Sequence, residues 1–502
     1  MKKSLLLFSM IATLCITGCD SSRSVKSNEG DTSGEPADST NINSDSSDNS
    51  ESSNNSQPSS EPSAPKEELK NDNFTLLLPN DLSSMSKNCK KYVDDMRAQQ
   101  QKLIKEKGAQ ADYYINDLYG NNGVDITKGV LPSSGNYQDN TGGYRDGKTQ
   151  NDYLDPIGAD YTKGEKSDES KGIEIEFKPA DSLKNKEYTI TYGMKSDLSD
   201  AKTITTNDTK TSIKNLLVNQ KYYYKVTADG KDSALADFTT GDYPRWIDAR
   251  PMFNVRDAGG YMTSSGQRIK QGLVYRGGEI TKDTNWYGSQ RYTDDTGKTD
   301  ARDGHIVTQT DAAKKVFREQ MGMVNGVEID LRAQGECGKS GNYNACGFAE
   351  NGDITYSRQS ISSYYNGMKN NTSLIKNVFD KIAEADQHPV YYHCYGGADR
   401  TGTIGFLLGA VLGMSYTDLV IDFELTSYSS NPSRNYRSHL RNGPWNDWPG
   451  LVDYLTRTSN SGLGWGTTKT IKQGAEEYLL NKCKVSQETI NKIREIMLEP
   501  AK

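Results

Sequence analysis

Residues 390–403 constrain the fold of this chain more than any other segment. A short apolar run that starts at Val390 ends at Cys394, two adjacent glycines follow, and a longer apolar run extends from Ile404 to Met414. This order predicts a buried strand, a tight loop and a helix. The loop residues are therefore expected at the carboxyl end of a strand and at the amino end of a helix.

Cys394 opens this loop, and Arg400 closes it six positions later. A cysteine is a nucleophile only as the thiolate, and a free cysteine has a pKa of ~8.5. The start of a helix carries partial positive charge and unpaired N–H groups, which lower a thiol pKa and attract a phosphate. The arrangement predicts an enzyme that attacks a phosphate monoester with sulfur.

The neighbouring residues fit the same chemistry. Gly396 and Gly397 allow the backbone to fold into a cradle with its amides turned inward. Arg400 can hold two phosphate oxygens with its planar fork and stabilise charge in the transition state. Thr401 can donate its hydroxyl to the sulfur, and His393 can hold the cysteine backbone through a ring hydrogen bond. Each of these side chains has a role around a bound phosphate.

A plainer interpretation is that Cys394 is a small buried residue in a strand-to-helix turn. Cysteine is among the most buried residue types, so this is the usual role of a lone cysteine. A structural cysteine does not require a histidine before it, two glycines after it, and Asp-Arg-Thr-Gly to close the turn. The catalytic interpretation is therefore preferred.

The loop His393-Cys394-x5-Arg400-Thr401 resembles the phosphate loop of the cysteine-dependent protein tyrosine phosphatases. Its Gly-x-Asp-Arg-Thr-Gly ending resembles the bacterial tyrosine and dual-specificity family that also acts on lipid phosphates. Other segments that resemble this family are Asn254-Val-Arg256-Asp257-Ala-Gly259-Gly260-Tyr261, Gly272 to Arg276, Val327 to Arg332, Glu477 to Leu479, and Val485 to Leu498. The resemblance covers about half of the chain, roughly from residue 245 to 500.

The resemblance implies an α/β catalytic domain with a central, mostly parallel sheet flanked by helices. It implies that Cys394 attacks phosphorus and forms a phosphocysteine. The residues expected around the phosphate are Tyr395, Gly396, Gly397, Ala398, Asp399 and Arg400, and those expected to support the loop are His393, Thr401, Arg256 and Asp257. No metal ion and no cofactor are expected, because the loop supplies the positive charge.

The chain departs from the family at two points. The family often has lysine where this chain has Ala398, and losing that charge argues mildly against phosphoinositide substrates. The family also commonly places an aspartate acid after the strand expected here at 354–358, but the following segment, 359–364, has no carboxylate. Asp399, within the loop, is therefore the candidate general acid. The alternative is that Asp399 is a structural carboxylate that bonds the loop or Arg256.

Two further aspartates are expected to be architectural. Asp330 is expected to pair with Arg332, and Asp257 with Arg256.

The amino terminus has the pattern of an export signal. Residues 1–19 contain two lysines, an apolar middle and the sequence Ile16-Thr17-Gly18-Cys19, which resembles a bacterial lipobox. We expect cleavage before Cys19 and lipid attachment there, so that the protein is anchored to the membrane on its extracytoplasmic side. An ordinary cleaved signal or a short anchor are the alternatives. Residues 20–66 are serine-, asparagine- and acid-rich and predict a disordered tether.

Charge and cysteine content limit the possible partners. The net charge of −7 argues against nucleic acid as a partner. Cys337 and Cys346 flank a polar loop and can pair in an oxidising exterior, but their spacing does not suit a zinc site.

The middle of the chain predicts two further regions. Residues 67–168 read as helical pieces and loops without an assigned role. Residues 169–243 alternate between apolar and polar positions and predict a small β-sandwich. Leu216 followed by Tyr222 resembles the tyrosine corner of fibronectin type III domains. The catalytic domain is expected over residues 244–502.

The leading hypothesis is a surface-tethered, cysteine-dependent phosphatase for phosphotyrosine or a related phosphate monoester. Two alternatives remain. One is a phosphoinositide or inositol-phosphate phosphatase, and the other is a noncatalytic phosphate-binding or adhesion protein.

Overall fold

The computed structural model describes residues 65–107, 170–249, 252, 254–279, 292–293, 299–300, 315–333, 354–429, 451, 454–455 and 470–501. The expected signal with Cys19, most of the expected tether, and the cysteines Cys337 and Cys346 lie outside the described residues. Among the residues described, no helix combines the length and the apolar character that crossing a bilayer requires.

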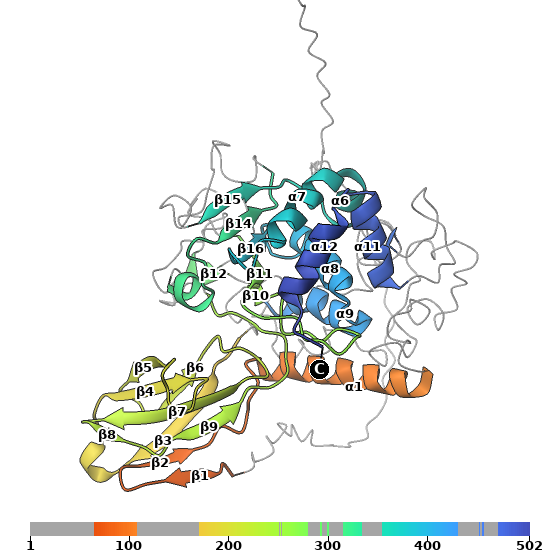
Figure 1. Cartoon of the computed structure of the whole chain (residues 1–502). Coiled ribbons are helices and arrows are strands. Elements are labelled where there is room, and N and C mark those ends of the chain that lie inside the picture. Colours follow the sequence, from red (N-terminus) through yellow and green to blue (C-terminus); the bar gives the residue numbers. More distant parts are fainter. Residues whose placement is uncertain are drawn as a thin grey trace, which may run out of the picture. The chain divides into compact units, whose positions relative to one another are not determined.

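A β-sandwich forms the first part of the described chain (Figure 1). Its first sheet has the order β1-β2-β3-β6 and its second the order β5-β4-β7-β8, with β9 also paired to β7. The strands are β1 (Glu68–Lys70), β2 (Phe74–Leu77), β3 (Ile173–Pro179), β4 (Tyr188–Gly193), β5 (Lys202–Thr206), β6 (Lys210–Ile213), β7 (Lys221–Ala228), β8 (Lys231–Asp232) and β9 (Ala236–Thr239), with a short 3-10 helix, η6 (Asp181–Leu183), after β3.

Alternation of buried and exposed positions produces the core of the sandwich. Along β7 every second side chain is buried, and β3 follows the same pattern. The inward residues of both sheets form one cluster, in which Phe177 and Tyr188 meet edge to face at 4.9 Å. The hydroxyl of Tyr222 accepts a hydrogen bond from the backbone N–H of Leu217 at 3.0 Å. This bond ties β7 to the turn before it.

The predicted boundary of the sandwich at residue 169 is wrong. β2 pairs antiparallel with β3, with Leu76 opposite Phe177, so the sheet takes strands from a segment about a hundred residues earlier. Helix α1 (Lys87–Lys107) follows β2 and buries Tyr92 and Met96 in the core of the catalytic domain. Strands β1 and β2 are too short to show a clear alternation, and the pairing of β2 with β3 is not local.

The second part of the chain contains a five-stranded sheet with the order β10-β11-β16-β14-β15. Its strands are β10 (Arg256–Asp257), β11 (Val274–Gly277), β14 (Val327–Asp330), β15 (Thr355–Arg358) and β16 (Val390–His393). β10 runs antiparallel to β11, and the other neighbours are parallel. The expected mixed α/β catalytic fold is therefore present, and four strands end at the same edge.

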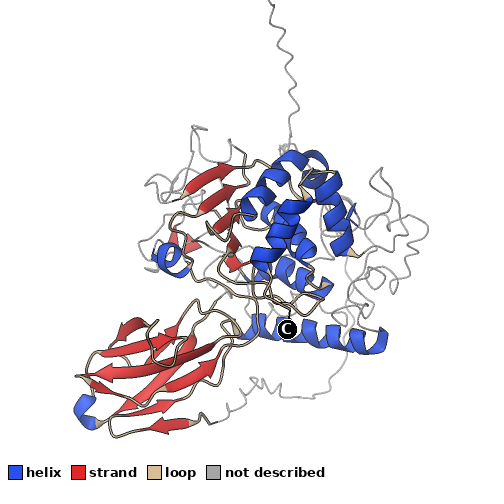
Figure 2. Cartoon of the chain, viewed as in Figure 1, coloured by secondary structure: helices blue, strands red, loops and turns tan. Residues whose placement is uncertain are grey.

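Helices cover one face of this sheet (Figure 2). They are α6 (Tyr364–Asn370), α7 (Thr372–Ile382), α8 (Asp399–Leu412), α9 (Tyr416–Leu425), α11 (Ile471–Asn481) and α12 (Gln487–Met497). Smaller elements are β12 (Tyr292–Thr293), β13 (Thr299–Asp300), a π-helix, η7 (Val316–Gln320), and a 3-10 helix, η9 (Thr426–Tyr428). The helices pack on Val274, Val327, Ile329, Val390 and Tyr392 of the strands.

The opposite face of the sheet is partly polar. The strand register aligns Tyr391 with Glu328, and His393 with Asp330, which lies opposite Arg358. These side chains share a face because successive residues of a strand point to opposite sides. Buried charges therefore line this face near the carboxyl edge.

Candidate active site

The loop of residues 394–398 connects the end of β16 to the start of α8. Gly397 has a φ of +65°, and a Cβ atom there would lie 2.4 Å from the backbone carbon of Gly277. Only glycine has both the required conformation and the required lack of a side chain. The tight turn thus depends on close contact with the end of the neighbouring strand β11.

Four consecutive carbonyl oxygens of the loop accept hydrogen bonds from the surrounding scaffold. His393 Nδ1 lies 3.0 Å from the Cys394 oxygen, and the N–H of Glu279 donates to the Tyr395 oxygen at 3.0 Å. The side-chain amide of Asn254 donates to the oxygens of Gly396 and Gly397, at 3.0 and 3.1 Å. Arg276 also donates to Gly397, at 3.1 Å.

These bonds determine where the loop amides point. In a trans peptide unit the C=O and the following N–H point in opposite directions. Carbonyls held by the scaffold from Cys394 to Gly397 therefore direct the N–H groups of residues 395–398 away from it and toward the interior of the loop. Successive amides that converge in this way form a site for an anion.

Buried arginines support the loop from behind. Arg256 and Arg276 both lie against Asp422 of α9, with Arg256 Nε 3.4 Å from the carboxylate, and both are fully buried. Arg256 also donates to the backbone oxygen of Asp422 at 2.9 Å and stacks 5.0 Å from the centre of the Trp246 ring. The expected pairing of Arg256 with Asp257 is therefore wrong, because the helix α9 supplies the carboxylate instead.

Asp257 pairs with Arg245, a residue that the sequence analysis did not single out. Arg245 donates to Asp257 at 2.7 Å and to the backbone oxygens of Asn215 and Leu216, at 2.9 and 3.1 Å. Asp257 also accepts the N–H groups of Gly259 and Gly272. Arg245 therefore connects the end of the sandwich to the segment that supports the loop.

Cys394 is 2% exposed. Burial alone would raise its pKa, but the charge of Arg400 and hydrogen bonds of Thr401 outweigh burial and lower the pKa, while the charge of Asp399 opposes them. The thiolate is therefore favoured compared with an ordinary cysteine.

Asp399 receives a hydrogen bond from the hydroxyl of Tyr364. The N–H of Tyr364 donates to Thr403 Oγ1 at 2.7 Å, and that hydroxyl donates to the backbone oxygen of Asp399 at 2.9 Å. Tyr364 has a φ of +51°, which is rare for a bulky residue and which clusters at functional sites. The segment expected to carry an acid thus carries a tyrosine that reaches the loop aspartate.

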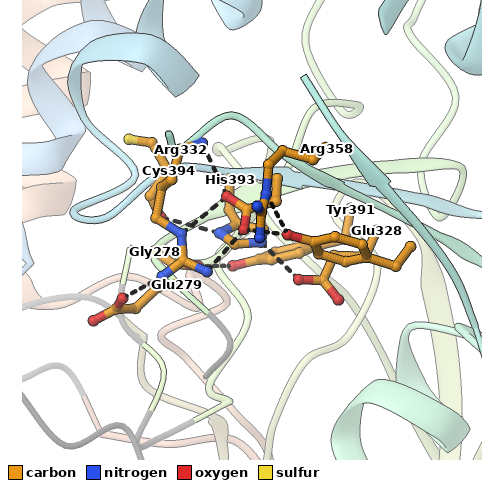
Figure 3. A network of polar contacts seen from close by, with 10 residues as sticks. Gly278, Glu279, Glu328, Arg332, Arg358, Tyr391, His393 and Cys394 are labelled. Atoms are coloured by element: carbon orange, nitrogen blue, oxygen red, sulfur yellow. Dashed lines mark hydrogen bonds and ion pairs between the residues drawn. The ribbon is translucent and has the colours of Figure 1, made fainter. Parts of the chain in front are cut away.

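A buried polar network lies behind the cysteine (Figure 3). The expected pair of Asp330 and Arg332 is present, with two contacts of 2.9 Å, and Arg332 also donates to Glu279 at 2.6 Å. His393 Nε2 lies 2.9 Å from Glu328 Oε1. The sequence analysis missed both glutamates. An acid inside the apolar strand 327–330 was a signal for Glu328, whereas Glu279 had no comparable signal.

Burial and charge shift the pKa values in this network. Burial raises the pKa of Glu279 to about 7, although the charge of Arg332 opposes it. Burial alone would raise the pKa of Asp330, but Arg332 outweighs burial and holds the pKa well below its usual range. Burial alone would lower the pKa of His393, but the Asp330 charge and the hydrogen bond to Glu328 raise it.

Comparison with known proteins identifies the class of this domain. Residues 247–499 match the tyrosine phosphatase family, which is half of the chain. The chain therefore belongs to the tyrosine phosphatase family, and its catalytic domain is that of a phosphatase. No curated protein matches the chain.

One solved structure that is similar to this chain is the core catalytic domain of the PP-IP phosphatase SIW14 from S. cerevisiae in complex with citrate. It is 14% identical over 25% of this chain and 72% of that chain, with a TM-score of 0.19. A likeness at this level carries no conclusion about the substrate of this chain.

Proposed function

We propose that this chain is a cysteine-dependent phosphatase that hydrolyses phosphotyrosine or related phosphate monoesters through a phosphocysteine intermediate. The observation that supports this most is the set of four loop carbonyls held by the scaffold, which turns the amides of residues 395–398 away from the scaffold and leaves them to bind an anion. Cys394 stands at one end of this loop and Arg400 at the other. The arrangement suits an anion that lies within reach of a thiolate.

The chemistry follows in two steps. The Cys394 thiolate attacks phosphorus, the bond to the leaving oxygen breaks, and that oxygen takes a proton from the acid. The loop amides and Arg400 hold the three non-bridging oxygens throughout. Water then attacks the phosphocysteine, the same acid group accepts a proton from the water, and inorganic phosphate leaves with the thiolate restored.

Asp399 is proposed as the proton donor. It is half-buried at the first position of α8, directly after the loop, and the Tyr364 hydroxyl holds one of its oxygens. Asp399→Asn is expected to lower kcat about 100-fold for a phosphotyrosine peptide, whose leaving group needs a proton. The loss for p-nitrophenyl phosphate, whose leaving group is stable as an anion, is expected to be much smaller. Equal losses on both substrates would place the acid elsewhere.

Tyr364→Phe tests whether the tyrosine serves this aspartate. It is expected to lower kcat more for the phosphotyrosine peptide than for p-nitrophenyl phosphate. The loss should be smaller than for Asp399→Asn, because the carboxyl remains but loses its partner. In the variant that carries both substitutions, Tyr364→Phe is expected to add little to Asp399→Asn. Additive losses would show that Tyr364 acts independently of Asp399.

We also propose that the protein is exported and carries lipid on Cys19, with the fibronectin III-like sandwich as a spacer before the catalytic domain. The sequence pattern of residues 1–19 supports this. In a bacterial host, labelled fatty acid is expected to attach to the wild-type protein, which should fractionate with membranes. Cys19→Ala is expected to abolish both, and labelling that persists in Cys19→Ala would contradict the proposal.

The first experiment on activity compares the protein without residues 1–19 and its Cys394→Ser variant. The substrates are a phosphotyrosine peptide, a phosphoserine peptide, a phosphoinositide and inositol hexakisphosphate, each with a chelator present. We expect phosphate release from the phosphotyrosine peptide at a rate at least about 1000-fold above that of the variant. Release from the inositol compounds alone would replace the proposed substrate class. No release from any of them, with the thiol shown to be reduced, would favour a binding protein.

A further inference from the structure

Both ring nitrogens of His393 face hydrogen-bond acceptors. Nδ1 lies 3.0 Å from the carbonyl oxygen of Cys394, and Nε2 lies 2.9 Å from Glu328 Oε1. A carbonyl oxygen only accepts, so Nδ1 carries a proton. A carboxylate at the Glu328 position would accept a second hydrogen bond, from a protonated Nε2. The two contacts are those that an imidazolium makes, and both side chains are fully buried.

The charges around this pair are arranged so that Glu328 is the direct partner of His393. The titratable and charged groups that face the imidazole are Glu328 and Asp330 of β14, Arg332 after β14, Glu279 after β11, Tyr356 and Arg358 of β15, and Tyr391 of β16. Asp330 is held by Arg332 through two contacts, and Arg332 also reaches Glu279. Tyr356 donates to Asp330, and Arg358 donates to the Tyr356 oxygen. Asp330 and Glu328 therefore both favour a charged imidazole, and Glu328 is the one of the two that hydrogen-bonds to it.

A buried ion pair is a poor source of stability, because removing two charges from water offsets their attraction. A neutral histidine beside a glutamine would fill the same space and keep the bond to the Cys394 carbonyl. What the carboxylate adds is an acceptor that favours a second proton on the imidazole. The resulting positive charge lies against the carbonyl oxygen of Cys394.

We propose that Glu328 is a positioning residue of this phosphatase, whose buried carboxylate keeps His393 doubly protonated so that the imidazolium fixes the Cys394 carbonyl and stabilises the Cys394 thiolate. The inference rests on the proposed role of Cys394 as the nucleophile. It gives strand β14 a role in the chemistry through Glu328. The sequence patterns indicated only that this strand is buried.

The test replaces the charge and keeps the shape, with Glu328→Gln. The rate of Cys394 alkylation by iodoacetamide is measured from pH 4 to 9 on the protein without residues 1–19, and the modified residue is identified by mass spectrometry of its peptide. The midpoint for Glu328→Gln is expected about one pH unit above that of the wild type. Below the midpoint, alkylation is then about tenfold slower, because the thiolate fraction falls, while the limiting rate at high pH is nearly unchanged.

Two variants serve as controls. Glu328→Asp retains the charge, and its alkylation midpoint is expected to stay close to that of the wild type. Tyr356→Phe removes a part-buried hydroxyl of the adjacent strand, which donates to Asp330 and not to His393, and it is expected to leave the midpoint in place. In each variant, the acidic side of the pH profile of kcat/KM for the phosphotyrosine peptide is expected to shift together with the alkylation midpoint.

An unchanged midpoint in a folded Glu328→Gln protein would overturn the inference, as would an equal loss of activity at every pH. If Glu328→Gln does not fold, the imidazole of wild-type His393 is titrated by NMR instead. A doubly protonated ring at pH 7.5 supports the inference, and a neutral ring overturns it. Alkylation needs no substrate, so this result is separate from the question of which phosphate ester is turned over, or whether any is.

Discussion

The sandwich and the catalytic domain place their charges in opposite ways. In the sandwich, ion pairs lie on the surface, as for Lys225 and Asp232, whose side chains are 33% and 46% exposed. In the catalytic domain, Arg332 and Asp330 are paired at 1% and 0% exposure, and His393 and Glu328 are both at 0%. The sandwich core is made of aromatic and aliphatic side chains.

The difference shows what buried charge is used for in this protein. Surface pairs contribute little to stability, and buried pairs are expensive to desolvate, so neither region gains much from them. In the catalytic domain the buried side chains of Arg276 and His393 hold loop carbonyls, and the half-buried Arg400 lowers the pKa of the cysteine. The sandwich has no such loop to hold, and an apolar core is sufficient for it.

The largest expected effect comes from removing one member of the buried network. Arg332→Ala leaves Asp330 and Glu279 without their shared cation, and we expect the free energy of unfolding of the catalytic domain to fall by about 4 kcal/mol. Urea denaturation followed by tryptophan fluorescence measures this. A loss below about 1 kcal/mol would show that the network behaves like a surface pair.

The next-largest effect is expected in the pH dependence of stability, which should differ between the two regions. The pKa of Glu279 is raised from 4.5 to about 7, so the folded form holds a proton that the unfolded form releases. The unfolding free energy should therefore fall by about 3 kcal/mol as pH rises from 4.5 to above 7. The raised pKa of His393 acts in the same direction, since its contribution is present below its unfolded pKa and lost as pH rises through the folded one.

Region-resolved hydrogen exchange from pH 5 to 8, corrected for intrinsic rates, measures this difference. Amides of β14 and β16 are expected to lose protection as pH rises, and those of β4 and β7 are not. Glu279→Gln is expected to flatten the trend in β14 and β16. The same change of amide protection with pH in both regions would contradict the assignment of the effect to the buried network.

Arg245 lies where the two regions meet, and its replacement has an intermediate expected effect. Arg245→Lys keeps the charge near Asp257 but cannot maintain the bonds to the backbone oxygens of Asn215 and Leu216. We expect a loss of about 2 kcal/mol in stability. Thermal unfolding monitored by calorimetry tests this, and an unchanged profile would show that these bonds contribute little at the junction.

The smallest effect is expected at the sandwich surface. Lys225→Ala removes an exposed partner of Asp232 and should change stability by less than about 1 kcal/mol. The same denaturation experiment used for Arg332→Ala provides the direct comparison. A loss as large as that of Arg332→Ala would remove the distinction between the two regions.

Local patterns predicted much of the fold. The strand at 390–393 lies where the apolar run indicated, and the helix predicted from the run 404–414 is α8, which begins earlier, at Asp399. The strands at 274–277, 327–330 and 355–358 lie in segments that the family resemblance indicated. Strand β2 and the packing of α1 were missed because their partners lie far away in the sequence, and β1 joins the sandwich through its pairing with β2. Short-range periodicity carries no information about such pairings.

For the site, the sequence by itself determined the order of groups along the loop from His393 to Thr401. That order depends on neighbouring residues, and so it can be read from spacing. Only the tertiary structure decided which residues hold the loop. Asn254 and Arg276 reach its carbonyls, Tyr364 reaches Asp399, and Glu328 reaches His393 across the sheet. A hydrogen bond between residues that are 35 to 143 positions apart depends on strand order and register, which no local pattern specifies.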